Sequence, residues 1–174
     1  MHARADELIR TLRLQPHREG GHFSEVFRSR RRVLVEGAGG TTVERSVLTT
    51  IYFLLAESEA SRWHRLDADE LWHFYEGEPL ELYLLDPKAQ ILSRVRLGSA
   101  ASGAAGAPGT PQLPAYVRVV PMGSWLAARP TGPYALVGCS MGPGFEYEGL
   151  TLMKDEPAVA VEVARRFPEA AELI

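Results

Sequence analysis

Residues 61–77, SRWHRLDADELWHFYEG, decide the predicted fold. The segment is typical of two β-strands joined by a turn at residues 66–69, where two aspartates suit the reversal of the chain. Because side chains alternate along a strand, Glu70, Trp72 and Phe74 share one face of the second strand. A carboxylate in line with two aromatic rings is expected on an interior face, where a buried acid needs a partner.

His64 is the natural partner of Glu70, since it lies six residues earlier, on the neighbouring strand. Burial in an aromatic pocket would raise the pKa of the carboxyl group, and the pair would tune the histidine near neutrality. Proton-transfer chemistry needs such a pair. The pattern therefore predicts His64 and Glu70 as catalytic candidates.

Short apolar or alternating segments, separated by Gly, Pro and Asp turns, continue on both sides of this hairpin. They predict further strands at residues 21–28, 46–55, 80–85, 91–97, 116–120, 124–128, 134–140 and 149–153. Apolar residues at helical spacing predict short helices over residues 3–13 and 156–167. Together these segments indicate one all-β domain over residues 1–174, a sandwich or barrel flanked by two terminal helices.

The composition is that of an ordinary globular protein, with 45% hydrophobic and 24% charged residues. A net charge of −3 gives no electrostatic reason to expect nucleic acid or an anionic membrane as a partner. Cys139 is the only cysteine, which suits a reducing compartment, and no apolar run is long enough to span a bilayer, so we expect a cytoplasmic protein. Residues 98–114, rich in Gly, Ala, Ser and Pro, are expected to form a mobile loop.

The spacing in the hairpin resembles the first sequence motif of the cupins, G-x5-H-x-H-x3,4-E-x6-G. His64, Glu70 and Gly77 occupy matching positions, while Leu66 stands where the second histidine would be. A later segment, PMGSWL, resembles the second cupin motif, P-x-G-x2-H, with Leu126 in place of the histidine.

The chain is still more similar to a small bacterial and fungal cupin family of unassigned function, DUF985. The shared segments are an early EGG-[YH]-F, a run like TTIYFLL, the core S-x-x-H-R…D-E-x-W-H-F-Y-x-G and a late PGF, at residues 19–23, 49–55, 61–77 and 143–145. The resemblance implies a double-stranded β-helix, the jelly-roll barrel of cupins, with a small-molecule pocket and a homodimeric assembly.

Metal-binding cupins use three histidines and one glutamate, and this chain departs from that pattern. Leu66 and Leu126 cannot ligate, and His64 and Glu70 alone are too few for a stable transition-metal site. We therefore expect no metal and no other cofactor. A metal-dependent cupin with ligands from elsewhere, such as His22, remains an alternative.

Sugar-nucleotide epimerases of the cupin superfamily carry an early R-G-x-F-x-E segment, and residues 18–25, REGGHFSE, look similar with one extra residue. The resemblance implies an isomerase or epimerase acting on a carbohydrate-like or sugar-nucleotide substrate. His64 would be the general base, Glu70 would orient it, and a tyrosine would act as the acid, with Tyr134, Tyr83 and Tyr52 as the candidates. The side chains expected to contact the ligand are Phe23, Glu25, Ser61, Trp72, Phe74 and Trp125. The main alternative is a cupin that binds a small ligand without catalysis.

Overall fold

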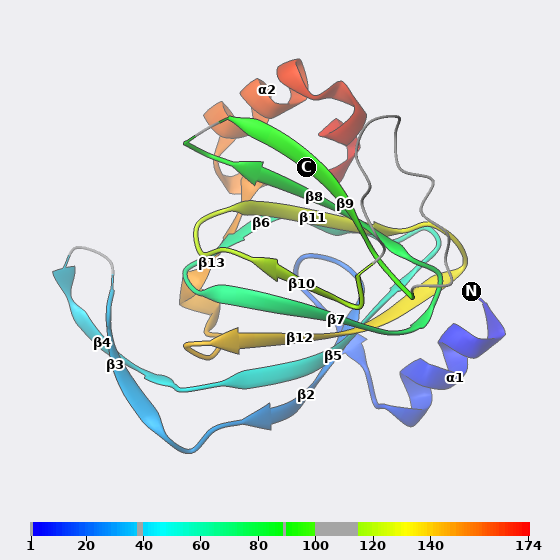
Figure 1. Cartoon of the computed structure of the whole chain (residues 1–174), viewed down its shortest axis with the longest axis horizontal. Coiled ribbons are helices and arrows are strands. Elements are labelled where there is room, and N and C mark those ends of the chain that lie inside the picture. The colour runs from blue at the N-terminus through cyan, green and yellow to red at the C-terminus, as the bar shows by residue number, and fades with distance from the viewer. Residues whose placement is uncertain (1, 38–39, 89, 100–114) are drawn as a thin grey trace.

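The computed structural model describes residues 2–37, 40–88, 90–99 and 115–174. Two antiparallel β-sheets lie face to face (Figure 1). The first sheet contains, in spatial order, β1 (Gln15–Pro16), β2 (His22–Arg28), β5 (Thr49–Ala56), β12 (Tyr134–Gly142), β7 (Asp69–Gly77) and β10 (Val117–Val120). The second sheet contains β13 (Leu150–Leu152), β6 (Ser61–Leu66), β11 (Trp125–Pro130), β8 (Leu80–Asp86) and β9 (Ile91–Leu97).

The alternation of side chains along these strands creates the core between the sheets. On β7, Trp72 is only 1% exposed, whereas Tyr75, on the opposite face, is 52% exposed. The predicted interior face of Glu70, Trp72 and Phe74 is therefore confirmed. Apolar side chains of both sheets complete this core, among them Phe53, Leu55, Leu80, Leu82, Leu97, Leu126 and Val137. Burying each such side chain contributes about 2 kcal/mol.

Each sheet carries helical structure on its outer face. Helix α1 (Ala3–Thr11) packs Ala5 and Leu8 against Leu54 and Leu136 of the first sheet. The second sheet is covered by α2 (Pro157–Arg166) and the 3₁₀ helix η5 (Pro168–Leu173), which pack against Trp63, Tyr83 and Trp125. Two further 3₁₀ turns, η3 (Tyr147–Gly149) and η4 (Met153–Asp155), flank β13. Both predicted helices are thus present, with slightly narrower bounds.

The structure corrects the prediction of one long strand over residues 46–55. Strand β4 (Thr42–Ser46) ends where that strand was expected to begin, and β5 starts at Thr49. Val47 and Leu48 lie between them, partly exposed, so an apolar run alone does not show where the chain turns. Strand β4 pairs with β3 (Arg32–Glu36) in a hairpin that the sequence did not predict, and Figure 1 shows it extending from the two sheets.

The predicted all-β class is confirmed, but the described strands form separate sheets and no ladder joins them into a closed barrel. None of the helices in the described residues has the length and apolar character needed to cross a membrane. Most of the predicted mobile loop, residues 100–114, lies outside the described residues. The single domain, the homodimer and the cytoplasmic location stay predictions.

Candidate functional site

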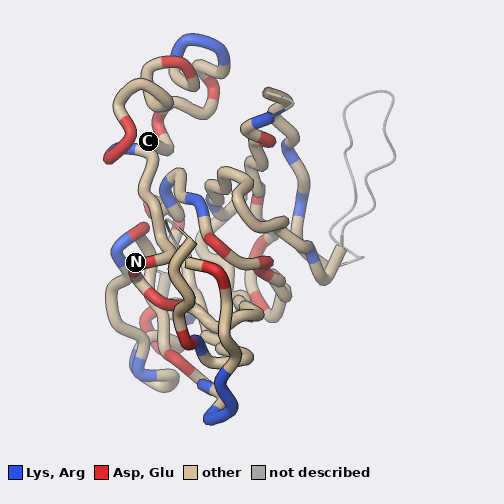
Figure 2. The backbone as a smooth tube through the Cα atoms, turned by 90° about the vertical axis from the view of Figure 1, so that its left-hand side faces the viewer, with Lys and Arg blue, Asp and Glu red and all other residues tan. Residues whose placement is uncertain are grey.

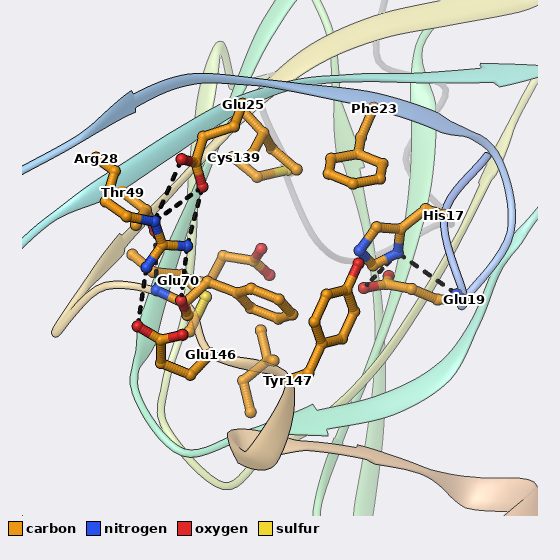
Figure 3. A pocket seen from close by; sticks show the side chains of 14 residues that line it. His17, Glu19, Phe23, Glu25, Arg28, Thr49, Glu70, Cys139, Glu146 and Tyr147 are labelled. Atoms are coloured by element: carbon orange, nitrogen blue, oxygen red, sulfur yellow. Dashed lines mark hydrogen bonds and ion pairs between the residues drawn. The ribbon is translucent and has the colours of Figure 1, made fainter. Parts of the chain in front are cut away.

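A cavity of about 120 Å³ opens against the inner face of the first sheet (Figure 3). Strands β2, β5, β7 and β12 form its floor, Leu66 of β6 closes one side, and the turn that follows β12 crosses its mouth. The residues that line it are His17, Glu19, Phe23, Glu25, Arg28, Thr49, Ile51, Leu66, Glu70, Cys139, Met141, Phe145, Glu146 and Tyr147. Four of these are glutamates, which makes the cavity rich in acid–base groups.

Glu70 faces the cavity from β7 and is buried, with 7% of its surface exposed. Its Oε2 accepts a hydrogen bond from Trp72 Nε1 at 2.6 Å. Among the described residues, no donor reaches its other oxygen, Oε1. Burial raises the pKa of Glu70 to about 7; the charge of Glu19 adds to the rise, while His64 and the Trp72 hydrogen bond oppose it. Glu70 therefore changes protonation state near neutral pH.

Glu19 joins two histidines and a serine through one buried carboxylate. Its Oε2 accepts from Ser61 Oγ at 2.6 Å and lies 3.3 Å from His64 Nδ1. Its Oε1 lies 3.3 Å from His17 Nδ1. A single side chain thus connects the β1–β2 turn with β6, and it satisfies polar groups that would be costly to bury alone.

The turn between β1 and β2 explains how Glu19 reaches β6. Gly20 and Gly21 follow it with φ of +109° and +67°, a region that suits glycine. A Cβ atom on Gly20 would lie 2.1 Å from the carbonyl oxygen of Ala60, so only glycine lets the chains approach this closely. The backbone N–H of Arg62 donates to the Glu19 carbonyl at 2.8 Å and fixes the two segments together.

The two histidines differ in their access to the cavity. His64 is 1% exposed, does not line the cavity and has Nδ1 2.7 Å from the Arg62 carbonyl, so Nδ1 carries the proton and donates. His17 lines the wall, edge-on to Phe23 and stacked on Tyr147. Burial lowers the pKa of His17, although the neighbouring Glu19 opposes the change, and the ring is neutral near pH 7. His17 is therefore the histidine that can contact a ligand.

A cluster of three charged side chains, Glu25, Arg28 and Glu146, stands at the mouth, and we call it the mouth triad. Arg28 Nη2 donates to Glu25 Oε2 and Nη1 donates to Glu146 Oε1, both at 2.9 Å. Nη2 also donates to the Phe145 carbonyl at 3.1 Å, and Nε to Glu25 at 3.2 Å. Figure 3 shows this triad on one side of the cavity, with His17, Glu19 and Tyr147 on the other.

The structure brings together most of the predicted site residues. Phe23, Glu25 and Glu70 line the cavity. Ser61 and His64 lie behind it and act through Glu19. Trp72 supports Glu70, while Phe74 belongs to the core between the sheets. The predicted hairpin of residues 61–77 is wrong, because β6 and β7 belong to different sheets and do not pair. No hydrogen bond joins His64 to Glu70 within the described part of the chain, so the predicted pair is coupled through charge.

Two predicted residues lie away from the cavity. Tyr134 is on the outer face of the first sheet, where its hydroxyl donates to Glu76 Oε1 at 2.7 Å beside helix α1. Trp125 is on the outer face of the second sheet, under Arg65 and against α2. Its neighbour Leu126 faces the core, so the alternation along β11 turns Trp125 outward.

Only Phe23, Glu25 and Glu70 of the fourteen lining residues were predicted as site residues. The polar side chains among the other eleven are those of His17, Glu19, Arg28, Thr49, Cys139, Glu146 and Tyr147. The tyrosine expected in the pocket is Tyr147 rather than Tyr134. A signal existed for it, because only Glu146 separates it from the family's PGF segment at residues 143–145. Cys139 is a buried thiol, and burial raises its pKa well above the usual range, helped by the charges of Glu70 and Glu19.

The donor set does not fit the usual metal site of cupins. Leu66 and Leu126, which cannot ligate, face the interior at the positions of two histidine ligands. In the described residues, no three His, Cys, Asp or Glu side chains converge in a way that could hold a metal ion. Whether the protein contains a metal stays a prediction, which elemental analysis can test.

Comparisons with known proteins agree with this architecture. The family model for the Cupin superfamily (DUF985) matches residues 6–153. A hypothetical protein from Leishmania major is 28% identical over 98% of this chain and 96% of that chain, with a TM-score of 0.76. Protein SO0799 from Shewanella oneidensis is also 28% identical, over 97% of this chain and 93% of that chain, with a TM-score of 0.75.

A more distant likeness concerns the fold alone. Oxalate decarboxylase from Bacillus subtilis is 14% identical, with a TM-score of 0.55, and the match covers 91% of this chain and 36% of that chain. No functionally curated protein matches the chain. The predicted double-stranded β-helix is confirmed, and the chain belongs to the cupin superfamily, in the DUF985 family.

Proposed function

We propose that the cavity catalyses proton transfer on a small carbohydrate-like molecule, a reaction of isomerase or epimerase type. The observation that carries this proposal is Glu70, a buried carboxylic acid with one oxygen turned to the cavity and a pKa of about 7. A general acid–base group works best when its pKa lies near the working pH. Glu70 therefore replaces His64 as the proposed proton-transfer group.

The proposed step needs no oxidant or reductant. Ionised Glu70 takes a proton from a carbon next to a carbonyl group, and the C–H electron pair moves into a carbon–carbon double bond as the carbonyl becomes an enolate. In an isomerisation, the hydroxyl proton on the deprotonated carbon moves to the enolate oxygen, and neutral Glu70 returns its proton to the former carbonyl carbon. In an epimerisation, another donor protonates the opposite face of the deprotonated carbon, and Glu70 releases its proton to solvent. His17, neutral and in the cavity wall, is placed to hydrogen-bond the enolate oxygen.

The remaining polar residues would act as positioning residues. Glu19 holds His17 on one side and is itself held by Ser61 and His64. Trp72 fixes one oxygen of Glu70 and leaves the other for the substrate. This arrangement supports catalysis, because acids with strongly raised pKa values are typical of proton-transfer sites.

Deuterium wash-in from solvent tests the proposal. Wild-type protein is incubated in D₂O with neutral and amino aldoses and ketoses, and exchange at the carbon beside the carbonyl is followed by NMR. We expect Glu70→Gln to lower the exchange rate about 100-fold or more, and His64→Ala to lower it less. Glu148→Gln, an exposed acid outside this cavity, serves as the matched control and should keep the wild-type rate.

Two results would contradict the proposal. Equal exchange rates in wild type and Glu70→Gln would remove Glu70 from the reaction. Binding of a sugar without any exchange would show a ligand-binding cupin that performs no catalysis, the alternative expected from the sequence.

A further inference from the structure

The charge around the cavity is unbalanced. Four glutamates line it, at positions 19, 25, 70 and 146, against one arginine, Arg28. Even when Glu70 is protonated, three carboxylates remain against one guanidinium. Because like charges repel more strongly where water is excluded, such a cavity disfavours phosphate and carboxylate ligands.

Arg28 does not offset this, because its hydrogen-bond donors are already engaged. Nε and Nη2 donate to Glu25, Nη1 donates to Glu146, and Nη2 also reaches the Phe145 carbonyl. An anion at the mouth would have to displace one of these carboxylates. The mouth triad as a whole carries a charge of −1, so it attracts a cation.

The wall beside the mouth triad adds a second feature that suits a cation. Phe145 and Tyr147 meet edge to face with their ring centroids 5.0 Å apart, and both line the cavity. Arg18 already places its guanidinium carbon 4.3 Å from the Tyr147 ring centroid. Aromatic rings next to carboxylates are a common way to bind an ammonium group.

Glu70 supports a ligand in the cavity by an observation that does not depend on the charge of the mouth triad. It is more than nine-tenths buried, it is turned into the cavity, and among the described residues its Oε1 has no hydrogen-bond donor. This oxygen opens onto the cavity, where water or a polar group of a ligand can reach it. A ligand hydroxyl or carbonyl-bearing carbon would lie against it, well inside the mouth triad.

We propose that the ligand carries an ammonium group and no phosphate or carboxylate: an amino sugar rather than a sugar nucleotide. Its ammonium group would lie on the cavity side of the mouth triad, beside the carboxylates that flank Arg28 and against Phe145 and Tyr147, while its carbonyl end faces Glu70. The carbohydrate part of this proposal rests on the proposed function, whereas the charge rests on the lining residues alone.

Calorimetric titration at pH 7 tests the charge with four probes: glucosamine, glucose, N-acetylglucosamine and glucosamine 6-phosphate. We expect glucosamine to bind roughly fivefold tighter than glucose and N-acetylglucosamine, as one or two partly exposed ion pairs would give, and the phosphate to bind most weakly. The preference for glucosamine should shrink at high salt.

Variants of the mouth triad sharpen the test. Glu25→Gln and Glu146→Gln should each reduce the preference for glucosamine over glucose by about threefold. The double variant removes both negative charges around Arg28 and leaves the guanidinium charge uncompensated, so glucosamine 6-phosphate should bind about tenfold tighter than it binds to wild type. Glu148→Gln controls for the loss of an exposed negative charge outside this cavity, and far-UV circular dichroism confirms folding of each variant.

The outcomes separate the two proposals. Equal binding of glucose and glucosamine, tightest binding of the phosphate, or no glucosamine binding at millimolar concentration would overturn the inferred ammonium ligand. Preferential glucosamine binding without deuterium wash-in would uphold it and contradict the catalytic proposal. Wash-in on glucose as fast as on glucosamine would support catalysis and overturn the ammonium ligand.

Discussion

Replacing Glu70 by glutamine should remove a pH dependence of stability that this buried acid imposes on the fold. The side-chain oxygen of glutamine can still accept from Trp72 Nε1, which lies 2.6 Å from Glu70 Oε2 in the wild type. The amide carries no charge at any pH. The variant therefore keeps the contact and loses the ionisation.

The size of the effect follows from the pKa. Burial raises the pKa of Glu70 from 4.5 to about 7 in the folded protein. Between these values the folded state holds the proton that the unfolded chain has released, so the free energy of unfolding falls as the pH rises. At about 1.4 kcal/mol per pH unit, the full window corresponds to about 3 kcal/mol. Because the Glu70→Gln variant has no carboxyl group at this position, its free energy of unfolding does not fall for this reason.

Urea unfolding followed by far-UV circular dichroism measures the difference. Relative to wild type, Glu70→Gln should gain about 3 kcal/mol of stability between about pH 4.5 and about pH 8. Other titrating groups are shared by the two proteins and cancel in the comparison. For Glu148→Gln, at an exposed position, the difference from wild type should stay constant with pH. The reasoning would be refuted by a constant difference between Glu70→Gln and wild type across this range, or by one that falls as the pH rises.

Three further predictions follow from the contacts around the site. Glu19→Ala removes the acceptor of a buried serine hydroxyl and should lower the free energy of unfolding by about 2 kcal/mol, against about 1 kcal/mol for Ser61→Ala, both measured by urea unfolding; equal losses would contradict the joining role of Glu19. Tyr134→Phe should cost about 1 kcal/mol, because the hydroxyl donates to Glu76, and should leave deuterium wash-in unchanged; a large loss of wash-in would restore Tyr134 as the acid. The metal-free protein expected from the sequence predicts that a metal chelator shifts the melting temperature by less than about 1 °C; near one metal ion per chain in elemental analysis would overturn this expectation.

Much of the site could be predicted from the sequence because it depends on the period of two along strands. Trp72 and Phe74 determine which face of β7 is the interior one, and Glu70 lies on the same face. The same rule explains why Trp125, which was expected to contact the ligand, does not line the cavity. Leu126 takes an inward position in the second cupin-like motif, so its direct neighbour has to point outward.

The contribution of the β1–β2 turn could not be predicted in this way. Glu19 lies in an irregular segment, and its contacts with Ser61 and His64 depend on how closely Gly20 approaches Ala60. Such a contact is set by tertiary packing rather than by any local period. The same holds for the mouth triad, where Arg28 and Glu146 are 118 residues apart in the sequence.

The distribution of the three tryptophans gives the molecule two separate optical reporters. Trp72 lies between the sheets, hydrogen-bonded to Glu70. Trp63 and Trp125 lie on the outer face of the second sheet, and Trp63 Nε1 donates to the Ala170 carbonyl in η5. Quenching of Trp72 would report on occupancy of the cavity. A red shift of the emission from Trp63 and Trp125 would report on detachment of the C-terminal segment. With single Trp→Phe variants, the fluorescence of unlabelled protein would therefore distinguish ligand binding in the cavity from detachment of the C-terminal segment on the other side of the second sheet.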